Sequence, residues 1–258
     1  MNKENKFIIE FDFQLISDYF KQLDRQGPGS LEATKKALSF IENLPDDARI
    51  ADIGCGSGGQ TIMLADNTKG HIKALDLLPD FINSLISKIK YTGYENRIEA
   101  IQGSMENLPF AEKEFDLIWA EGSIYNIGFE KGLCEWRKYL KDNGYIAVTE
   151  VSWFTVERPA EIEEFWHGNY PGIDTIPNKI KIMEQAGYIP VAHFTLTEDC
   201  WLEYFFNPMP PIMEKFLEQH NYSEVAKQFI AMLKNEIELY KKYKEYYGYV
   251  FYIGRKNQ

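Results

Sequence analysis

A glycine-rich segment has the residue types and spacing that most directly indicate chemistry. It reads DIGCGSGG over residues 52–59 and lies between a predicted strand at 50–53 and a predicted helix at about 60–67. Glycines let the backbone turn tightly and approach a ligand, and the helix start offers unpaired N–H groups. Asp76 ends the next predicted strand, where a carboxylate can accept hydrogen bonds from ribose hydroxyls. The segment therefore predicts a site for a ligand that contains adenosine.

Two adenosine ligands fit this segment. Gly54, Gly56 and Gly59 satisfy the G-x-G-x-x-G spacing of dinucleotide-binding loops, but S-adenosylmethionine (SAM) carries an adenosine as well. The charge of Asp52 would repel a pyrophosphate, whereas it suits the cationic ammonium end of an amino-acid-bearing cofactor. The loop also follows a helical lead-in predicted over residues 11–44, while a nicotinamide-binding fold often begins at its glycine strand. These features favour SAM and leave an NAD-dependent oxidoreductase as the less favoured alternative.

The charge of the chain argues against polyanionic partners. Its formal net charge is −11, and no Lys/Arg-rich run compensates for it locally. Nucleic acids are held mainly by cationic groups that displace counterions, and an anionic membrane surface would repel this chain in the same way. We therefore expect a small-molecule partner, and neither a nucleic acid nor a membrane.

Cysteine usage and the start of the chain indicate a cytoplasmic protein. Cys55, Cys134 and Cys200 are far apart and form no Cys-x-x-Cys pair, which predicts reduced thiols and no disulfide. Neither the cysteines nor the histidines have metal-ligand spacing, so no metal is expected. Residues 1–6 are polar, no signal-peptide core follows, and no apolar run approaches the roughly 20 residues that cross a bilayer.

Short apolar runs alternate with helical periodicity, which predicts an α/β fold with a parallel sheet. The last strand is expected to open at Gly248, and the predicted strands are 50–53, 71–75, 98–102, 115–119, 145–151, 189–196 and 249–253. Helices are predicted at about 60–67, 79–93, 131–140 and 223–246, and a further helix is predicted to end at residue 185. We expect one domain over residues 1–258, with a lead-in at 1–44 and cap insertions at 152–178 and 197–222 that could equally be packed surface loops.

Five segments form a set: DIGCGSG at 52–58, ALD at 74–76, GSMENLPF at 103–110, FDLIWA at 115–120 and LKDNGY at 140–145. Together they resemble the class I SAM-dependent methyltransferases, in particular the small-molecule group that includes the ubiquinone/menaquinone-type enzymes. The resemblance implies a Rossmann-like, doubly wound sheet of seven strands with the last strand antiparallel and helices on both faces. It also implies SAM as the cofactor and methyl transfer to a small-molecule acceptor as the activity.

The resemblance also assigns the cofactor site. Ser104 stands where many family members have an acidic residue that holds the adenine amino group, and a serine accepts that hydrogen bond more weakly. The turn at residues 27–29, followed by Ser30 as a helix N-cap, is expected near the amino-acid end of SAM. The residues expected to bind SAM are Asp52, Gly54, Cys55, Gly56, Gly58, Asp76, Leu77, Gly103, Ser104, Met105, Glu121 and Gly122.

Methyl transfer from a sulfonium is an in-line displacement that requires alignment and exclusion of water, and no metal. Ligands lie outside the carboxyl ends of parallel strands, so the ends of the fourth and fifth strands should face the methyl group. These ends contribute Glu121, Gly122, Ser123, Tyr125 and Asn126, then Glu150, Ser152, Trp153 and Phe154.

Three of the residues near the predicted acceptor are candidates for catalysis. Glu121 either orients or deprotonates the acceptor, or it shapes the floor of the site. Tyr125 either stacks on an aromatic or cationic acceptor or packs in the core. His167 is the histidine to test as a base, because it lies in an aromatic segment near Tyr170.

Some questions stay open at this stage. The aromatic cap is compatible with an aromatic or an amine acceptor, and exposed aromatic residues could support a homodimer. A SAM-binding regulatory protein without catalysis is the second functional hypothesis, since an intact glycine loop does not exclude it.

Overall fold

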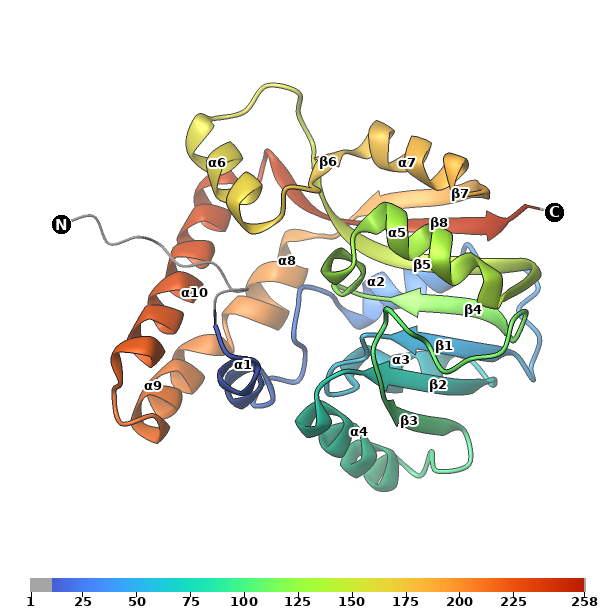
Figure 1. Ribbon diagram of the computed structural model, residues 1–258, viewed down its shortest axis with the longest axis horizontal. Coiled ribbons are helices and arrows are strands. Elements are labelled where there is room, and N and C mark those ends of the chain that lie inside the picture. The colour runs from blue at the N-terminus through green and yellow to red at the C-terminus, as the bar shows by residue number, and fades with distance from the viewer. Residues whose placement is uncertain (1–10, 258) are drawn as a thin grey trace.

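The computed structural model describes residues 11–257, so the first ten residues of the predicted lead-in lie outside it. One twisted sheet forms its centre, with strand order β3-β2-β1-β4-β5-β8-β7 and a two-residue strand β6 beside β5 (Figure 1). The strands are β1 (Arg49–Ile53), β2 (His71–Asp76), β3 (Ile98–Gln102), β4 (Phe115–Ala120), β5 (Leu140–Trp153), β6 (Asp174–Thr175), β7 (Tyr188–Thr195) and β8 (Tyr247–Lys256).

The direction of the strands confirms the predicted topology. β1 to β5 pair in parallel, whereas β8 runs antiparallel to both β5 and β7. The chain therefore contains the expected doubly wound sheet of seven strands with an antiparallel last strand, and β6 is an addition that the sequence did not indicate.

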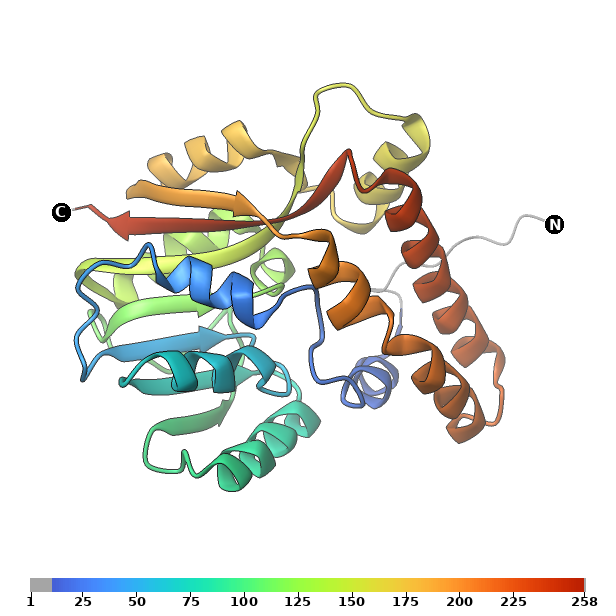
Figure 2. The ribbon, with the colours of Figure 1, turned by 180° about the vertical axis from the view of Figure 1, so that it is seen from behind.

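Helices cover both faces of the sheet. α5 (Phe129–Trp136) and α7 (Ile176–Gln185) lie on one face, and α2 (Leu31–Leu38) and α3 (Gly59–Asn67) lie on the other (Figures 1 and 2). Successive residues of a strand point to opposite faces. In β1 this places Ile50 in the core that includes α2 and α3, and Ala51 in the core under α5 and α7. α4 (Pro79–Thr92) joins the first of these cores.

A further group of helices lies beyond the carboxyl ends of the parallel strands (Figure 1). It contains α1 (Phe13–Phe20), α6 (Ala160–Asn169), α8 (Glu198–Trp201), the π-helix η4 (Leu202–Phe206), α9 (Met209–Gln219) and α10 (Glu224–Tyr243). Residues 152–178 contain α6, and residues 197–222 contain α8, η4 and α9, while their role as cap insertions stays a prediction. Aromatic side chains from these helices pack together, as in the stacked pair of Trp201 and Tyr240 with centroids 4.4 Å apart.

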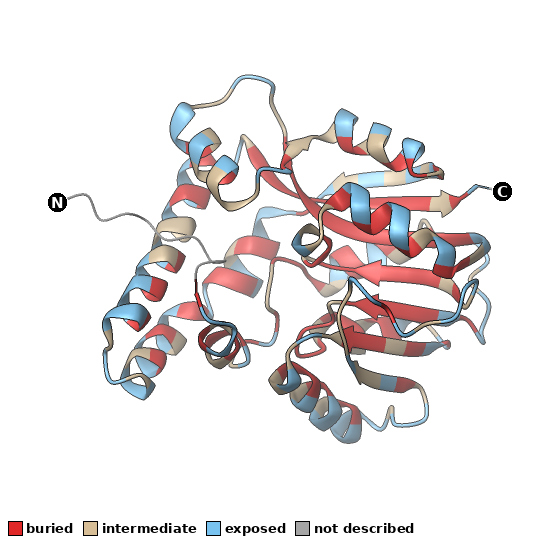
Figure 3. Ribbon diagram, viewed as in Figure 1, coloured by how far each residue is buried: buried red, intermediate tan, exposed pale blue. Residues whose placement is uncertain are grey.

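The strands differ in burial, and the last strand begins earlier than the sequence predicts. The central strands are buried along most of their length, whereas the edge strand β7 alternates between buried or half-buried and exposed residues (Figure 3). Gly248 does not open the last strand but lies inside β8, where it pairs with Ser152. A Cβ there would lie 2.9 Å from the Phe154 ring, so the glycine admits that ring against the sheet.

Two features are absent from the described residues. Within residues 11–257 no helix is long and apolar enough to span a bilayer. The same part of the chain contains no group of three or more His, Cys, Asp or Glu side chains placed to hold a metal ion.

Candidate functional site

The glycine segment forms a tight loop between β1 and α3. Gly54, Gly56 and Gly58 have positive φ angles of 74°, 54° and 88°, a region that side-chain-bearing residues rarely adopt. The N–H groups of Gly54 and Cys55 donate to the Leu75 carbonyl at 2.8 and 3.0 Å, which ties the loop to β2. A Cβ on Gly54 would lie 2.4 Å from the Ser123 Cβ, so this glycine lets the end of β4 approach the loop.

Asp52 is completely buried and faces α3. Its carboxylate accepts a hydrogen bond of 2.6 Å from the Thr61 hydroxyl and one of 3.5 Å from Gln60. Burial raises the pKa of Asp52 to about 7, and the nearby Glu121 charge adds to this increase. The carboxylate therefore fixes α3 against β1, and contact with the SAM ammonium through water or backbone stays a prediction.

The raised pKa of Asp52 predicts a pH-dependent stability. The folded chain holds the proton more tightly than the unfolded chain, so this stabilisation is complete below pH about 4 and is lost as pH rises through about 7. Asp52→Asn cannot ionise. We expect its free energy of unfolding to fall less over this range than that of the wild type, by up to about 4 kcal/mol, in urea titrations at several pH values. Parallel curves for the two proteins would contradict the assignment.

Asp76 is held by backbone groups on both sides. One carboxylate oxygen accepts from the Gly56 N–H and the other from the Leu78 N–H, each at 2.9 Å, and burial raises its pKa. Leu77 beside it is 50% exposed, although it is apolar. The half-buried carboxylate and this apolar side chain are features that a bound nucleoside would use and cover.

The segment after β3 lies next to this carboxylate. The Gly103 N–H donates to the Asp76 carbonyl at 2.9 Å, and the terminal methyl of Met105 lies 3.3 Å from a Cβ built on Gly54. The Ser104 hydroxyl accepts from the Glu106 N–H at 3.2 Å. Gly54, Asp76, Gly103 and Met105 are thus neighbours in space, while the role of Ser104 toward adenine stays a prediction.

Glu121, at the end of β4, is already surrounded by donors. Its carboxylate forms an ion pair with Arg25 and accepts from the Thr34 hydroxyl at 3.0 Å and the Trp119 indole N–H at 2.9 Å. The Glu121 side chain is only 2% exposed. These contacts favour the alternative in which Glu121 shapes the floor of the site.

The lead-in crosses the glycine loop. The side-chain oxygen Oε1 of Gln26 accepts from the Ser57 N–H at 2.8 Å, and its side-chain nitrogen Nε2 donates to the Leu23 backbone carbonyl at 2.9 Å. A Cβ on Gly56 would lie 2.3 Å from that Gln26 oxygen, so the side chain rests directly on the loop. Ser30 caps α2 by accepting from the Ala33 N–H, which confirms the predicted helix start.

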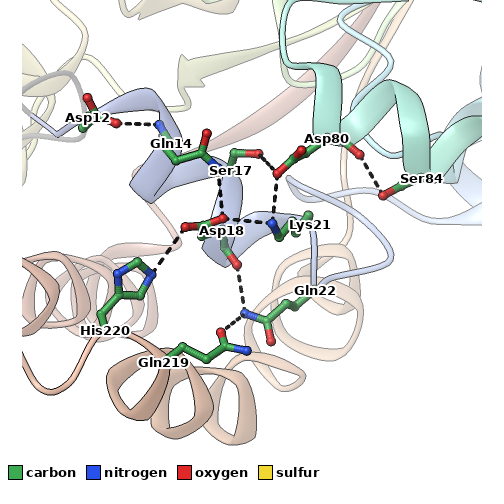
Figure 4. A network of polar contacts seen from close by, with 10 residues as sticks. All are labelled: Asp12, Gln14, Ser17, Asp18, Lys21, Gln22, Asp80, Ser84, Gln219 and His220. Atoms are coloured by element: carbon green, nitrogen blue, oxygen red, sulfur yellow. Dashed lines mark hydrogen bonds and ion pairs between the residues drawn. The ribbon is translucent and has the colours of Figure 1, made fainter.

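Polar contacts anchor the lead-in helix α1 at two places (Figure 4). Lys21 bridges Asp18 of α1 and Asp80 of α4, at 2.9 Å from each. On the other side, Asp18 lies 3.6 Å from the His220 imidazole, which follows α9. Helix α1 therefore joins α4 beside the sheet to the segment that follows α9.

Four tyrosines, Tyr125, Tyr170, Tyr247 and Tyr249, form a second feature at the ends of β4 and β5, which we call the tyrosine cluster. The rings of Tyr125 and Tyr170 meet edge to face with centroids 5.9 Å apart. Burial raises the pKa of Tyr125 to about 12, with added effects from Glu236 and Glu150. Tyr249 lies against Gly122, since a Cβ on this glycine would be 3.5 Å from its ring.

A buried ion pair supports one side of the tyrosine cluster. Lys179 donates to one Glu150 oxygen at 2.6 Å and to the Gly172 carbonyl at 2.8 Å. The Tyr170 hydroxyl donates to the same Glu150 oxygen at 2.6 Å. The other Glu150 oxygen is buried and has no hydrogen-bond partner among residues 11–257.

Comparison with known proteins identifies the family. Residues 50–144 match the model of a methyltransferase domain, which spans the glycine loop, Asp76 and the end of β4. Together with the methyltransferases named below, this match supports a class I SAM-dependent methyltransferase. SAM is the cofactor of this family, which decides between the two adenosine ligands that the glycine spacing left open.

Two curated relatives of this methyltransferase have named activities. A phosphoethanolamine N-methyltransferase of Plasmodium falciparum is 26% identical, over 78% of this chain and 73% of that protein. A demethylmenaquinone methyltransferase of Bacillus velezensis is 31% identical over 43% of this chain. The alignment spans about half the length of the latter protein, 49%.

Solved structures share the fold over almost the whole chain. A SAM-dependent methyltransferase from Geobacter sulfurreducens, in complex with S-adenosylhomocysteine (SAH), has a TM-score of 0.81 at 19% identity. The match covers 93% of this chain and 97% of that one. A second SAH complex, from Thiobacillus denitrificans, has a TM-score of 0.79 and covers 94% and 96% of the two chains at 19% identity.

Four further residues nominated from the sequence lie at different places in the structure of this methyltransferase. His167 is exposed on α6, and its role as a base stays a prediction. Ser152 is buried inside the sheet, where its hydroxyl pairs with that of Tyr252 at 2.8 Å. Trp153 is buried with the Arg158 guanidinium 4.2 Å above its ring, and the Asn126 amide donates to the Ser123 carbonyl at 2.9 Å.

Sequence analysis of this methyltransferase missed four residues at the site: Arg25, Thr34, Tyr249 and Glu236. Arg25 and Thr34 flank the 27–29 turn but have no motif of their own. Glu236 has a signal that could have been found. It stands four residues after Met232 and four before Tyr240 on the apolar face of the last long helix, where an unpaired charge is costly.

Proposed function

We propose that this methyltransferase moves the methyl group of SAM to a small-molecule acceptor that the tyrosine cluster positions. The contact between Tyr249 and Gly122 carries the proposal. Gly122 and Ser123 follow β4 beside the glycine loop, so Tyr249 joins the cluster to the proposed donor site. An acceptor on the tyrosine side would then face the donor across the ends of the strands, as ligands of doubly wound sheets do.

The cofactor roles are part of the proposal. The loop with Gly54, Cys55, Gly56 and Gly58 holds the methionine portion, since its backbone turns without side chains. Asp76 holds the ribose hydroxyls, and four residues near it, Leu77, Gly103, Ser104 and Met105, border the adenine. Glu121 and Gly122 lie closest to the transferred methyl group, and Asp52 supports the loop from beneath.

The helices beyond the strand ends form the proposed cap. They exclude water from a reaction that is aided by alignment and desolvation. The named relatives act on small molecules, namely phosphoethanolamine, demethylmenaquinone and sarcosine, which supports a small acceptor here as well. We propose further that the acceptor is either an aromatic compound or an amine. We also propose that the protein forms a homodimer.

Two assays with a matched pair of glycine variants test the proposal. Wild-type protein should bind SAM and SAH in calorimetry and transfer labelled methyl from SAM to the small-molecule fraction of a cell extract. Gly54→Val should abolish both, because any side chain there meets Ser123. Gly93→Asn is the control, since it lies at the end of α4 with open space around it and asparagine tolerates its positive φ. Binding without transfer in any extract would favour the regulatory hypothesis.

A further inference from the structure

We infer that the acceptor of this methyltransferase is a small cationic amine, whose ammonium group lies against the Glu236 carboxylate at the tyrosine cluster and gives its proton to that carboxylate. The inference rests on the proposed function and names the substrate class of the same site.

Glu236 is a carboxylate without a counterion in the described part of the chain. It lies on α10 between Met232 and Tyr240, on the face of the helix that packs inward. Among residues 11–257, no side chain forms a hydrogen bond or ion pair with it, and burial alone raises its pKa to about 7. Glu236 nevertheless keeps part of its accessible surface. A carboxylate on the inward face of a helix that is still partly reachable can meet a ligand in place of water.

The groups around Glu236 make its surroundings electronegative. Burial is the main cause of the raised pKa values of Tyr125 on η2 (Ile124–Asn126) and of Tyr247 and Tyr249 on β8, and the Glu236 charge adds to each of them. The Glu150 charge also acts on Tyr125 and Tyr249, and one Glu150 oxygen has no partner. The cation held at this cluster within the described part of the chain is Lys179, which is already bound to Glu150 and the Gly172 carbonyl.

This combination fits an ammonium group better than other acceptors. Aromatic faces attract cations, and an unpaired buried carboxylate gains most from a charged partner. A neutral quinone or phenol would leave Glu236 uncompensated. A phosphorylated acceptor would add negative charge where no free cation of the tyrosine cluster can pair with it.

The same carboxylate supplies the proton acceptor that amine methylation requires. A protonated amine has no lone pair to attack, so it must first lose a proton, and a group with a pKa near 7 can take it at neutral pH. The nitrogen lone pair then forms the new C–N bond. The electron pair of the C–S bond stays on sulfur, which converts the sulfonium to neutral SAH. The proton leaves Glu236 for water.

A matched pair of probes tests the charge preference. Choline carries a permanent cation, and dimethylbutanol has the same shape with carbon in place of nitrogen. With SAH bound, wild-type protein should bind choline at least about tenfold more tightly than dimethylbutanol in calorimetry, and Glu236→Gln should remove this difference. Glu238→Gln is the control, because Glu238 lies on the same helix in an exposed pair with Lys241. Equal binding of both probes to the wild type would overturn the inference.

The pH dependence of choline binding isolates Glu236, since choline does not titrate. Its affinity should rise about tenfold between pH 6 and 8 as Glu236 loses its proton, and this rise should vanish in Glu236→Gln. The neighbouring tyrosines have pKa values raised above this range, and Glu150 is paired with Lys179. If the affinity for choline still rises with pH in Glu236→Gln, another group causes the rise, and the inference is contradicted.

A turnover assay completes the test. Labelled methyl from SAM should be transferred to ethanolamine or another small amine in a panel, and phosphoethanolamine should be a poorer acceptor than ethanolamine. Glu236→Gln should lose at least about tenfold in kcat while its affinity for SAH stays unchanged. Transfer to phenols and not to amines would overturn the inference but leave the proposed function intact. Absence of SAH binding to the wild type would instead defeat the proposed function.

Discussion

Replacing Arg25 with methionine is expected to lower the free energy of unfolding by about 3 to 5 kcal/mol, measured by urea denaturation with SAM absent. The Arg25 and Glu121 side chains are only 8% and 2% exposed. Removing the guanidinium leaves the Glu121 charge buried with two neutral donors, Thr34 and Trp119, as its remaining partners. The cost arises because water cannot replace the lost partner at this position.

Two further variants show whether the cost comes from the uncompensated charge. Arg25→Met combined with Glu121→Gln should recover more than half of the loss, because a glutamine oxygen can still accept from Thr34 and Trp119 without carrying a charge. Lys69→Met breaks an exposed pair with Asp46 and should cost less than about 1 kcal/mol. A loss below about 1 kcal/mol in Arg25→Met would contradict the buried-pair argument.

Asp76→Ala is expected to weaken SAM binding by about 10- to 100-fold, or about 1.4 to 2.7 kcal/mol, in calorimetry at neutral pH. The change removes the acceptors proposed for the ribose hydroxyls, and it also frees the Gly56 and Leu78 N–H groups that the carboxylate now binds. Both effects act on the cofactor side, so SAM and SAH should lose affinity equally.

Asp142→Ala serves as the matched control for Asp76. Its carboxylate is exposed at the opposite ends of the strands and pairs with Lys113, so SAM affinity should not change. An Asp76→Ala protein that is folded and binds SAM as tightly as the wild type would disprove the ribose assignment.

The sequence was sufficient for the parts of the molecule that depend on local signals. The glycine loop, Asp76 and the alternation of strands with helices are each encoded within a short stretch, so their type and order could be predicted. Gly248 shows the limit, because its place inside β8 depends on the Phe154 ring, which lies far away in the sequence. A glycine beside a strand gives the same local signal whether it opens the strand or makes room within it.

The pairing of distant side chains could not be predicted in this way. Arg25 and Glu121 are 96 residues apart, and Glu150 and Lys179 are 29 apart. A lone arginine or lysine in the sequence predicts a solvated side chain, since buried cations are rare. Glu236 is different, because its place on an apolar helix face was visible and only its unpaired state required the structure.

The position of Gln26 on the glycine loop predicts how the proposed cycle is limited. Each turnover must release SAH and admit a fresh donor, and we expect both molecules to pass the segment that holds Gln26 and Arg25, because the Gln26 side chain lies directly on the loop. Opening this segment requires breaking the buried pair with Glu121, so product release, and not the chemical step, is expected to limit kcat. A burst of one product equivalent before slower steady-state turnover would be its kinetic signature.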